Sequence, residues 1–536
     1  MNTTPRPERM DINNLETYIE DGSIKIPKFQ REFVWEVKKT GELLDSILKG
    51  YPIGTFIFWK TNEKLQYIKN IGGFDIKKSK KNSTTSYILD GQQRITSLYA
   101  CLKGLPIKDN DYSKIFINLD AKDDEQIVFI DTKNLNPKKI ISFKEIYNLN
   151  LERIVKKYPY RVISRIQELS DRIKKYELSV IEVENAAIDV ATDIFTRINV
   201  SGKPLSVFEI MCAKIYDEKN NFDLAEKVKD LLDEWSNCDF ETISTTTILQ
   251  CMAICKNKSC KNRDILHLEK KFFIDNWDSI VKSMNAAIDY MKAHFGVQVS
   301  KLLPYDALLV PFTYYFYTNK NKTPNEDARK KLQDYFWRTV FNQRFTEGVT
   351  GKLQLDVQNV IDVITKGKKP EYKEGVNISV NFLDQKGEFS TGSAISKGIL
   401  CILSSKTPLS FKDGKKVTIS NDWLIQSNSK NYHHFFPKKY MSAKQHRIEK
   451  VNHIANITIL DSETNQEIKS KAPSVYIKKY SHSENFDKIL KSHLIGDLKK
   501  FGVLNDNYDT FFKSRLKKYN EELKKVITIR KNIDTV

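Results

Sequence analysis

The spacing of hydrophobic residues divides the chain into an N-terminal mixed part, a helical middle and a C-terminal part. Up to about residue 215, short apolar runs alternate with helical patterns, and helical spacing dominates from about 140 to 364. Residues 14–19 and 41–48 predict short helices, and a Lys-rich helix is predicted near 509–526. Strands are predicted at 55–59, 87–89, 115–119 and 127–130.

A basic turn at 367–370 is the best candidate for a linker between the middle and C-terminal parts. A chain of 536 residues is too long for a single core. We therefore expect an α+β multidomain protein with domains at 1–215, 216–375 and 376–536.

Apolar run lengths and cysteine usage indicate the cellular compartment. No run approaches 18 apolar residues, and the first residues lack the core of a signal peptide. The seven cysteines are odd in number and irregularly spaced, which favours reduced thiols. These features predict a cytoplasmic protein with no membrane partner.

The formal net charge is +19. An excess of this size suits a polyanion such as DNA or RNA, although an AT-rich coding bias also produces lysine. Charge alone therefore favours nucleic acid as a partner without specifying the activity.

The pentapeptide from Asp90 to Arg94 follows a predicted strand and opens a predicted helix that stops at Gly104. A tight turn into a helix aims free backbone N–H groups at one point, which favours an anion, and Arg94 can donate to a phosphate. Asp90 could instead hold a metal or a ribose hydroxyl. A structural interpretation is also open, in which Asp90 caps the helix and Arg94 makes an ion pair.

Two further segments pair polar side chains with turns: 26–35, with Gln30 and Arg31, and 193–206, with Arg197 and Asn199. Together with the Asp90 pentapeptide, these two segments occur in the same order as in the N-terminal domain of the GmrSD restriction family. The chain resembles that domain over roughly residues 10–215. The resemblance implies a fold similar to ParB and sulfiredoxin that binds and hydrolyses a nucleoside triphosphate. The implied nucleotide-binding residues are Gln30, Arg31, Asp90, Gly91, Gln92, Gln93 and Arg94, with Arg197 and Asn199 in support.

Histidine is concentrated near the C-terminus, where six of the eight lie after residue 430. His433 and His434 are adjacent, so on a strand they point to opposite sides and take different roles. Pro437 ends that strand, residues 456–460 predict a second strand, and Asn465 falls near the start of a following helix. A neutral histidine can serve as a base near pH 7, and a divalent cation can stabilise charge on a phosphate.

This pattern resembles the HNH, or ββα-metal, nuclease family. The resemblance implies that His433 and Asn465 bind the metal, that His434 is the catalytic base and that Asn456 orients it. An acidic residue is commoner at the position of His433, and imidazole accepts Mg²⁺ less readily than a carboxylate does. Mg²⁺ is the expected ion, with Mn²⁺ and Ni²⁺ as alternatives. His446 and His453, between the strands, are expected to be exposed.

Together, the two resemblances imply a metal-dependent DNA endonuclease of the modification-dependent, type IV restriction kind. It would be regulated by the nucleotide, act on modified phage DNA in antiviral defence, and work alone or as a homodimer. Two alternatives stay open: a non-catalytic ParB-like DNA-binding or regulatory protein, and an HNH RNase or toxin.

Overall fold

The computed structural model describes residues 5–30, 32–77, 84–133, 135–198, 206–421, 432–482, 485–527 and 533–534. The chain forms two compact units, Met1–Leu224 and Ala225–Val536. The boundary expected near residue 215 lies close to this division. The boundary expected near 375 falls inside the second unit. There Lys331 Nζ donates to the Gly367 carbonyl at 3.0 Å and Asn342 Nδ2 to the Gly375 carbonyl at 2.9 Å, so this segment is fastened to a helix.

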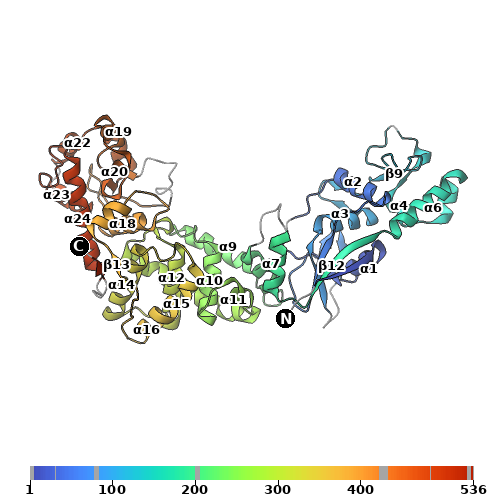
Figure 1. Ribbon diagram of the computed structural model, residues 1–536, viewed down its shortest axis with the longest axis horizontal. Helices are drawn as coiled ribbons and strands as arrows, with labels where there is room; N and C mark the ends of the chain where they lie inside the picture. The colour runs from blue at the N-terminus through green and yellow to red at the C-terminus, as the bar shows by residue number, and fades with distance from the viewer. Residues whose placement is uncertain are drawn as a thin grey trace. The chain divides into compact units, whose positions relative to one another are not determined.

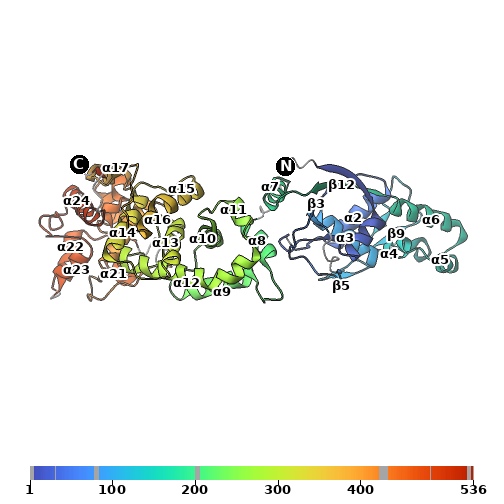
Figure 2. The same ribbon diagram turned by 90° about the horizontal axis from the view of Figure 1, so that it is seen from below.

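A mixed five-stranded sheet forms the centre of the first unit, in the order β1-β12-β3-β6-β2. β12 is parallel to β3 and β2 is parallel to β6, while the β1–β12 and β3–β6 pairs are antiparallel. Figures 1 and 2 show this sheet with its helices. The strands are β1 (Arg6–Asp11), β2 (Ile24–Lys25), β3 (Phe56–Thr61), β6 (Thr85–Asp90) and β12 (Glu177–Glu184).

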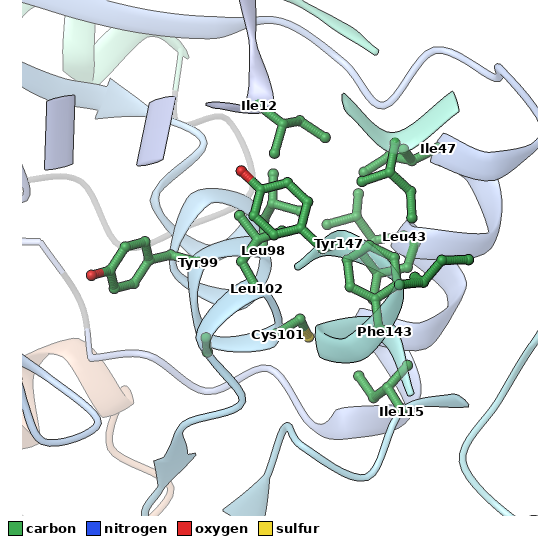
Figure 3. Close-up of a cluster of buried hydrophobic side chains, with 14 of the residues drawn as sticks. Ile12, Leu43, Ile47, Leu98, Tyr99, Cys101, Leu102, Ile115, Phe143 and Tyr147 are labelled. Atoms are coloured by element: carbon green, nitrogen blue, oxygen red, sulfur yellow. The ribbon is translucent and has the colours of Figure 1, made fainter. Parts of the chain in front are cut away.

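Helices pack their apolar faces against one another and the sheet to form the core of this unit. Figure 3 shows side chains of four helices, Ile12, Leu43, Ile47, Leu98, Leu102, Phe143 and Tyr147, in one cluster. Truncating one such buried aliphatic side chain to alanine costs about 2–5 kcal/mol. The helices are α1 (Ile12–Glu20), α2 (Val37–Leu48), α3 (Gln92–Lys103), α4 (Phe143–Tyr147), α5 (Leu151–Lys157), α6 (Tyr160–Lys174), α7 (Ile188–Ile198), α8 (Val207–Ile215) and the short η1 (Pro137–Lys139).

Smaller sheets complete the first unit. One has the order β10-β9-β11, and two are pairs, β4–β5 and β7–β8. The predicted strands at 55–59, 87–89, 115–119 and 127–130 correspond to β3, β6, β9 and β10, so these predictions are confirmed. The bounds are β4 (Asn70–Ile71), β5 (Phe74–Asp75), β7 (Pro106–Ile107), β8 (Asn110–Asp111), β9 (Phe116–Asn118), β10 (Val128–Phe129) and β11 (Ile140–Ser142).

The second unit begins with a helical region, as the apolar spacing predicts. Phe336, Val340 and Phe341 are buried, and Phe295 stacks on Phe336 with ring centroids 4.2 Å apart. The elements are α9 (Leu224–Ser236), α10 (Thr245–Asn257), α11 (Asn262–Leu266), α12 (Lys270–Phe295), η2 (Ser300–Leu302), η3 (Asp306–Leu308), α13 (Leu309–Thr318), α14 (Glu326–Phe341), α15 (Val349–Asp356), η4 (Val357–Ile361), α16 (Asp362–Thr365), α17 (Val380–Lys386) and α18 (Ala394–Ser405).

The C-terminal part of this unit contains two small two-stranded sheets and a group of helices, which Figure 1 shows gathered beside α18. β14 pairs antiparallel with β15, and β13 pairs parallel with β16. The elements are β13 (Val376–Asn377), β14 (Tyr432–His434), α19 (Lys438–Ala443), α20 (Ile448–Val451), η6 (Ile454–Asn456), β15 (Ile457–Ile459), α21 (Ser462–Ile468), α22 (Pro473–Tyr480), α23 (Phe486–Ser492), α24 (Tyr508–Val526) and β16 (Ile533–Asp534).

The seven cysteines are free thiols. Cys101, Cys251, Cys260 and Cys401 are buried, and burial raises the pKa of each thiol. Among the described helices, none combines the length and apolar character needed to cross a membrane.

Candidate functional site

His433 and His434 lie on β14, where they pair in register with Thr458 and Ile457 of β15. His433 is 3% exposed and His434 is half-buried. Because neighbouring residues on a strand face opposite sides, the two imidazoles have different surroundings. The chain then turns at Pro437, which precedes the first turn of α19. The predicted strand, break and second strand are therefore all present.

The predicted metal ligands are brought together. His433 Nδ1 lies 2.7 Å from Asn465 Oδ1, and Asn465 is on α21, whose N-terminus is capped by Asp461 accepting from Thr464 N at 2.7 Å. Neighbouring ligands on an octahedral Mg²⁺ at about 2.1 Å lie about 3 Å apart. An amide oxygen only accepts, so in the metal-free protein His433 Nδ1 carries the proton. Sharing an ion with Asn465 Oδ1 requires the other tautomer, with the proton on Nε2. With that shift, the two residues fit the metal that the family resemblance implies.

Both imidazoles are neutral near pH 7. Burial lowers the pKa of His433 to about 4, partly offset by the hydrogen bond to Asn465. Burial, followed by the positive charge of Lys438, lowers the pKa of His434 to about 3. A neutral imidazole keeps a lone pair that can bind a cation or accept a proton. His433 Nε2 is buried with no partner among the described residues, so this ring keeps unused hydrogen-bonding capacity.

His434 is held by Asn452, a residue that the sequence motifs do not single out. His434 Nε2 lies 3.2 Å from Asn452 Oδ1. Asn456, which was expected to orient His434, binds backbone instead: it accepts from Phe436 N at 2.8 Å and donates to the carbonyls of Phe436 and Val451. The fully buried amide of Asn456 therefore stabilises the turn after β14. Asn456 can affect His434 only through that turn.

The expectation that His453 is exposed is wrong. His453 is 3% exposed, Nε2 lies 3.1 Å from the Asp384 carbonyl, and Nδ1 accepts from Ala455 N at 3.1 Å. His446 is half-buried against the Tyr508 ring, with centroids 5.5 Å apart. Both histidines hold the loop between the strands, because tertiary packing covers a segment that is polar in sequence.

Basic side chains follow the histidine strand. Lys438, Lys439, Lys444 and Arg447 are exposed on α19 and the turn before α20. Within the described parts of the chain, none of the four forms an ion pair. Unpaired cations beside an imidazole pair create a positive surface that suits a phosphate backbone.

The described residues contain no group of three or more His, Cys, Asp or Glu side chains that could hold a metal. A His–Asn pair leaves most coordination positions to water or substrate. The small number of protein ligands suits Mg²⁺, which usually keeps several waters, whereas the imidazole ligand suits Mn²⁺ or Ni²⁺ better.

In the first unit, the Asp90–Arg94 pentapeptide ends β6 and starts α3. Gly91 has φ 93°, and a Cβ there would lie 2.3 Å from the Phe56 ring, so the turn requires glycine. Arg94 donates to the carbonyls of Ile53 at 2.7 Å and Thr55 at 2.9 Å, and to Asp90 at 2.9 Å. A phosphate could bind the terminal nitrogens of Arg94 only by sharing or replacing these contacts.

Gln92 and Gln93 of this turn and Gln30, which contacts the strand before it, differ in their hydrogen bonds. Gln93 accepts from Val34 N at 2.9 Å and donates to the Glu32 carbonyl at 3.0 Å, and Gln30 donates to the Ile88 carbonyl. Gln92 is 5% exposed, and its Nε2 has no partner among the described residues. Since no described side chain caps α3, the N–H groups of its first turn lie beside a glutamine with an unused donor.

The other residues that were predicted to bind the nucleotide are Arg197, Arg31 and Asn199. Arg197 pairs with Asp193 at 3.0 Å on the exposed side of α7. Arg31 and Asn199 lie outside the described residues.

Comparison with known proteins supports the assignment of the first unit. Residues 12–216 match the family model described as the GmrSD restriction endonuclease, N-terminal domain. This region resembles a GmrSD N-terminal domain. The match supports the GmrSD-like family and, through it, a nuclease of the restriction type with DNA as its partner. It agrees closely with the span of 10–215 expected from the three motifs.

A relative extends over nearly the whole chain. An uncharacterized protein of Methanocaldococcus jannaschii is 24% identical over 583 aligned positions, which cover 96% of this chain and 95% of that protein. Both units therefore occur together in a second protein.

Proposed function

We propose that this protein is a metal-dependent DNA endonuclease of the modification-dependent, type IV restriction kind, acting in antiviral defence. The main observation behind this proposal is that His433 Nδ1 on β14 lies 2.7 Å from Asn465 Oδ1 on α21, with His434 next to His433 on the strand. Two antiparallel strands followed by a helix supply these side chains in the order of an HNH site. The restriction-family match of the first unit supports the same activity independently.

In this proposal, His433 and Asn465 hold one divalent cation, Mg²⁺ or alternatively Mn²⁺ or Ni²⁺. When bound, the cation would supply charge stabilisation for the phosphate and the leaving oxygen. His434 accepts a proton from the attacking water through the lone pair of its neutral imidazole. Asn456 maintains the turn that places His434.

DNA would be held by the exposed basic residues beside the site. Lys438 is the first residue of α19, the helix that follows the histidine strand, and Lys439, Lys444 and Arg447 continue the positive surface. Lysine and arginine contacts to phosphates add affinity without reading sequence. Recognition of the modified base is therefore assigned elsewhere, and the first unit is our candidate for it.

The first unit would bind a nucleoside triphosphate in a ParB- and sulfiredoxin-like fold, and this nucleotide would regulate cleavage. The first turn of α3 offers backbone N–H groups to a phosphate, and Gln92 offers the unused amide donor. Arg94 would set the shape of this turn through its contacts to Ile53 and Thr55 and add positive charge behind the phosphate.

A cleavage assay tests the proposal. Purified protein is incubated with modified phage DNA, matched unmodified DNA and single-stranded RNA, each with Mg²⁺ and with or without nucleoside triphosphates. We expect cleavage of modified DNA only, altered by nucleotide. Cleavage of RNA alone would favour an RNase or toxin. DNA binding without cleavage under all metals would favour a regulatory protein. Sedimentation of the same sample reports whether it is a homodimer.

A further inference from the structure

The contacts around Asn452 determine which nitrogen of His434 carries the proton. Asn452 Nδ2 lies 3.1 Å from the Phe389 carbonyl, which can only accept. The amide nitrogen must therefore face Phe389, and Oδ1 must face His434. Since an amide oxygen only accepts, Nε2 of His434 is the protonated nitrogen.

The other ring nitrogen of His434, Nδ1, is then the atom that can accept a proton. With the proton on Nε2, His434 Nδ1 carries the lone pair, and it has no partner among the described residues. The opposite tautomer would set the Nε2 lone pair against Asn452 Oδ1 at 3.2 Å, which is repulsive. The amide thus favours one ring orientation and one tautomer.

Asn452 is itself firmly held. Its backbone carbonyl accepts from Phe389 N at 2.9 Å, and its N–H donates to the Ile448 carbonyl at 2.8 Å. The next residues bind the same neighbouring segment, because Ile454 N donates to the Gly387 carbonyl at 2.8 Å. Backbone hydrogen bonds therefore hold the segment between α17 and α18 against the loop that contains Asn452.

We propose that Asn452 is a positioning residue for His434, selecting the tautomer whose Nδ1 can accept a proton from water. The Phe389 carbonyl sets the direction of the Asn452 amide. This inference rests on the proposed nuclease function for its consequence, although the tautomer itself is a property of the protein without DNA. Residues in this supporting role typically change rate or affinity by about 10–100-fold.

The direct test is the ¹⁵N spectrum of histidine side chains in the metal-free full-length protein. His434 is assigned by the signals that His434→Ala removes. We expect protonated Nε2 and bare Nδ1 in the wild type, and mixed tautomers in Asn452→Leu, which has similar size and no polar atoms. Asn452→Asp keeps an acceptor facing Nε2 and should keep the wild-type tautomer. A wild-type His434 protonated on Nδ1 overturns the inference without any variant.

Kinetics supply the second measurement. We expect Asn452→Leu to lower kcat about 10–100-fold with KM for DNA unchanged, and Asn452→Asp to restore most of the rate. Equal kcat in Asn452→Leu and the wild type would also overturn it. If the tautomers are as expected but no preparation cleaves DNA, the positioning contact stands and the proposed function fails.

Discussion

The turn at Asp90–Arg94 and the strand at His433–His434 are both short polar motifs beside the end of a strand, but they use their hydrogen-bonding groups differently. In the first, Arg94 and Gln93 are engaged by backbone carbonyls and N–H groups of neighbouring segments. In the second, each imidazole has one nitrogen engaged, by Asn465 or by Asn452. The other nitrogen has no partner among the described residues.

This difference separates residues that build a site from residues that do chemistry in it. A donor already satisfied within the protein contributes mainly to stability, because its removal leaves partners without hydrogen bonds. A buried group with an unused lone pair or donor has a desolvation cost that no partner within the protein offsets. Such an atom is the better candidate for contact with a ligand.

The strongest test of this distinction is removal of the metal. Exhaustive chelation should abolish DNA cleavage, because His433 and Asn465 would then hold no cation to stabilise the phosphate charge. His433→Ala and Asn465→Ala should weaken metal affinity by at least about 10–100-fold, the range reported for residues that only support metal ligands. Isothermal titration with Mn²⁺ measures this affinity, and DNA binding serves as the control. Cleavage that survives chelation contradicts an HNH site.

Removing the base should lower the cleavage rate by about 10²–10⁴-fold, because a proton-accepting group active only in the transition state is lost. His434→Ala should fold normally and bind DNA, since its ring is half-buried and, among the described residues, makes one side-chain hydrogen bond, to Asn452. His453→Ala is the matched control: both of its nitrogens are engaged, so it should mainly lose stability. Single-turnover cleavage and thermal melting separate the two effects. Full activity in His434→Ala rejects its assignment as the base.

Lower pH should destabilise the second unit selectively. Burial lowers the pKa of His433 and His493 to about 4 and that of His434 to about 3, below the usual 6.5. The unfolded chain takes up protons below about pH 6.5 and the folded unit does not. The stability that neutral imidazoles provide is therefore complete above pH 6.5 and decreases toward pH 4. The loss is at most about 1.4 kcal/mol per pH unit for each histidine.

The first unit is the internal control for this effect, because residues 1–224 contain no histidine. Hydrogen exchange of the metal-free protein, corrected for the intrinsic pH dependence of exchange, reports both units in one sample. Equal loss of protection in both units between pH 7 and pH 5 contradicts the histidine explanation.

Replacing Arg94 should reduce stability before it reduces ligand affinity. Arg94→Ala leaves the carbonyls of Ile53 and Thr55 and the Asp90 carboxylate without their donor, at a cost of about 2–3 kcal/mol. The loss of stability in Arg94→Lys should be intermediate, because a lysine ammonium keeps the charge but lacks the paired donors of the guanidinium group. Hydrogen exchange across β6 and α3 measures the loss. Unchanged protection combined with lost nucleotide binding would instead make Arg94 a direct ligand.

The smallest effect is expected at Gln92. Gln92→Met keeps the approximate volume and removes the amide whose Nε2 has no described partner, so stability should change little. Nucleotide affinity should fall about 2–10-fold, the worth of one hydrogen bond. Fluorescent nucleotide titration measures it, and Gln93→Met, which removes contacts to Glu32 and Val34, is the structural counterpart. Affinity that is unchanged in Gln92→Met removes this side chain from the site.

Local patterns predicted much of the fold but less of the site. The strands β3, β6, β9 and β10 and the helix α3 follow from apolar runs and from the glycines at positions 91 and 104. The HNH resemblance implies that His433 and Asn465 hold one metal, and in the structure these two side chains lie close together. These predictions rest on features that are local in sequence, such as apolar runs and glycines, or on the resemblance to the HNH family.

The contacts that were not predicted depend on distant segments. Asn452 is oriented by Phe389, 63 residues earlier, and Arg94 binds Ile53, 41 residues earlier. His453 is buried because the segment around Asp384 covers it. No periodicity in a single chain encodes which distant carbonyl will face a given side chain, so these roles become visible only in the folded protein.

The state of the cysteines has a practical consequence for labelling. Burial raises the pKa of all seven thiols, including the half-buried Cys212, Cys238 and Cys255. Alkylating dyes react with the thiolate, so the native protein should label slowly at neutral pH. A cysteine introduced at the 92%-exposed Tyr160 would then react selectively. Fluorescent reporters can be attached to the first unit without first removing the natural cysteines.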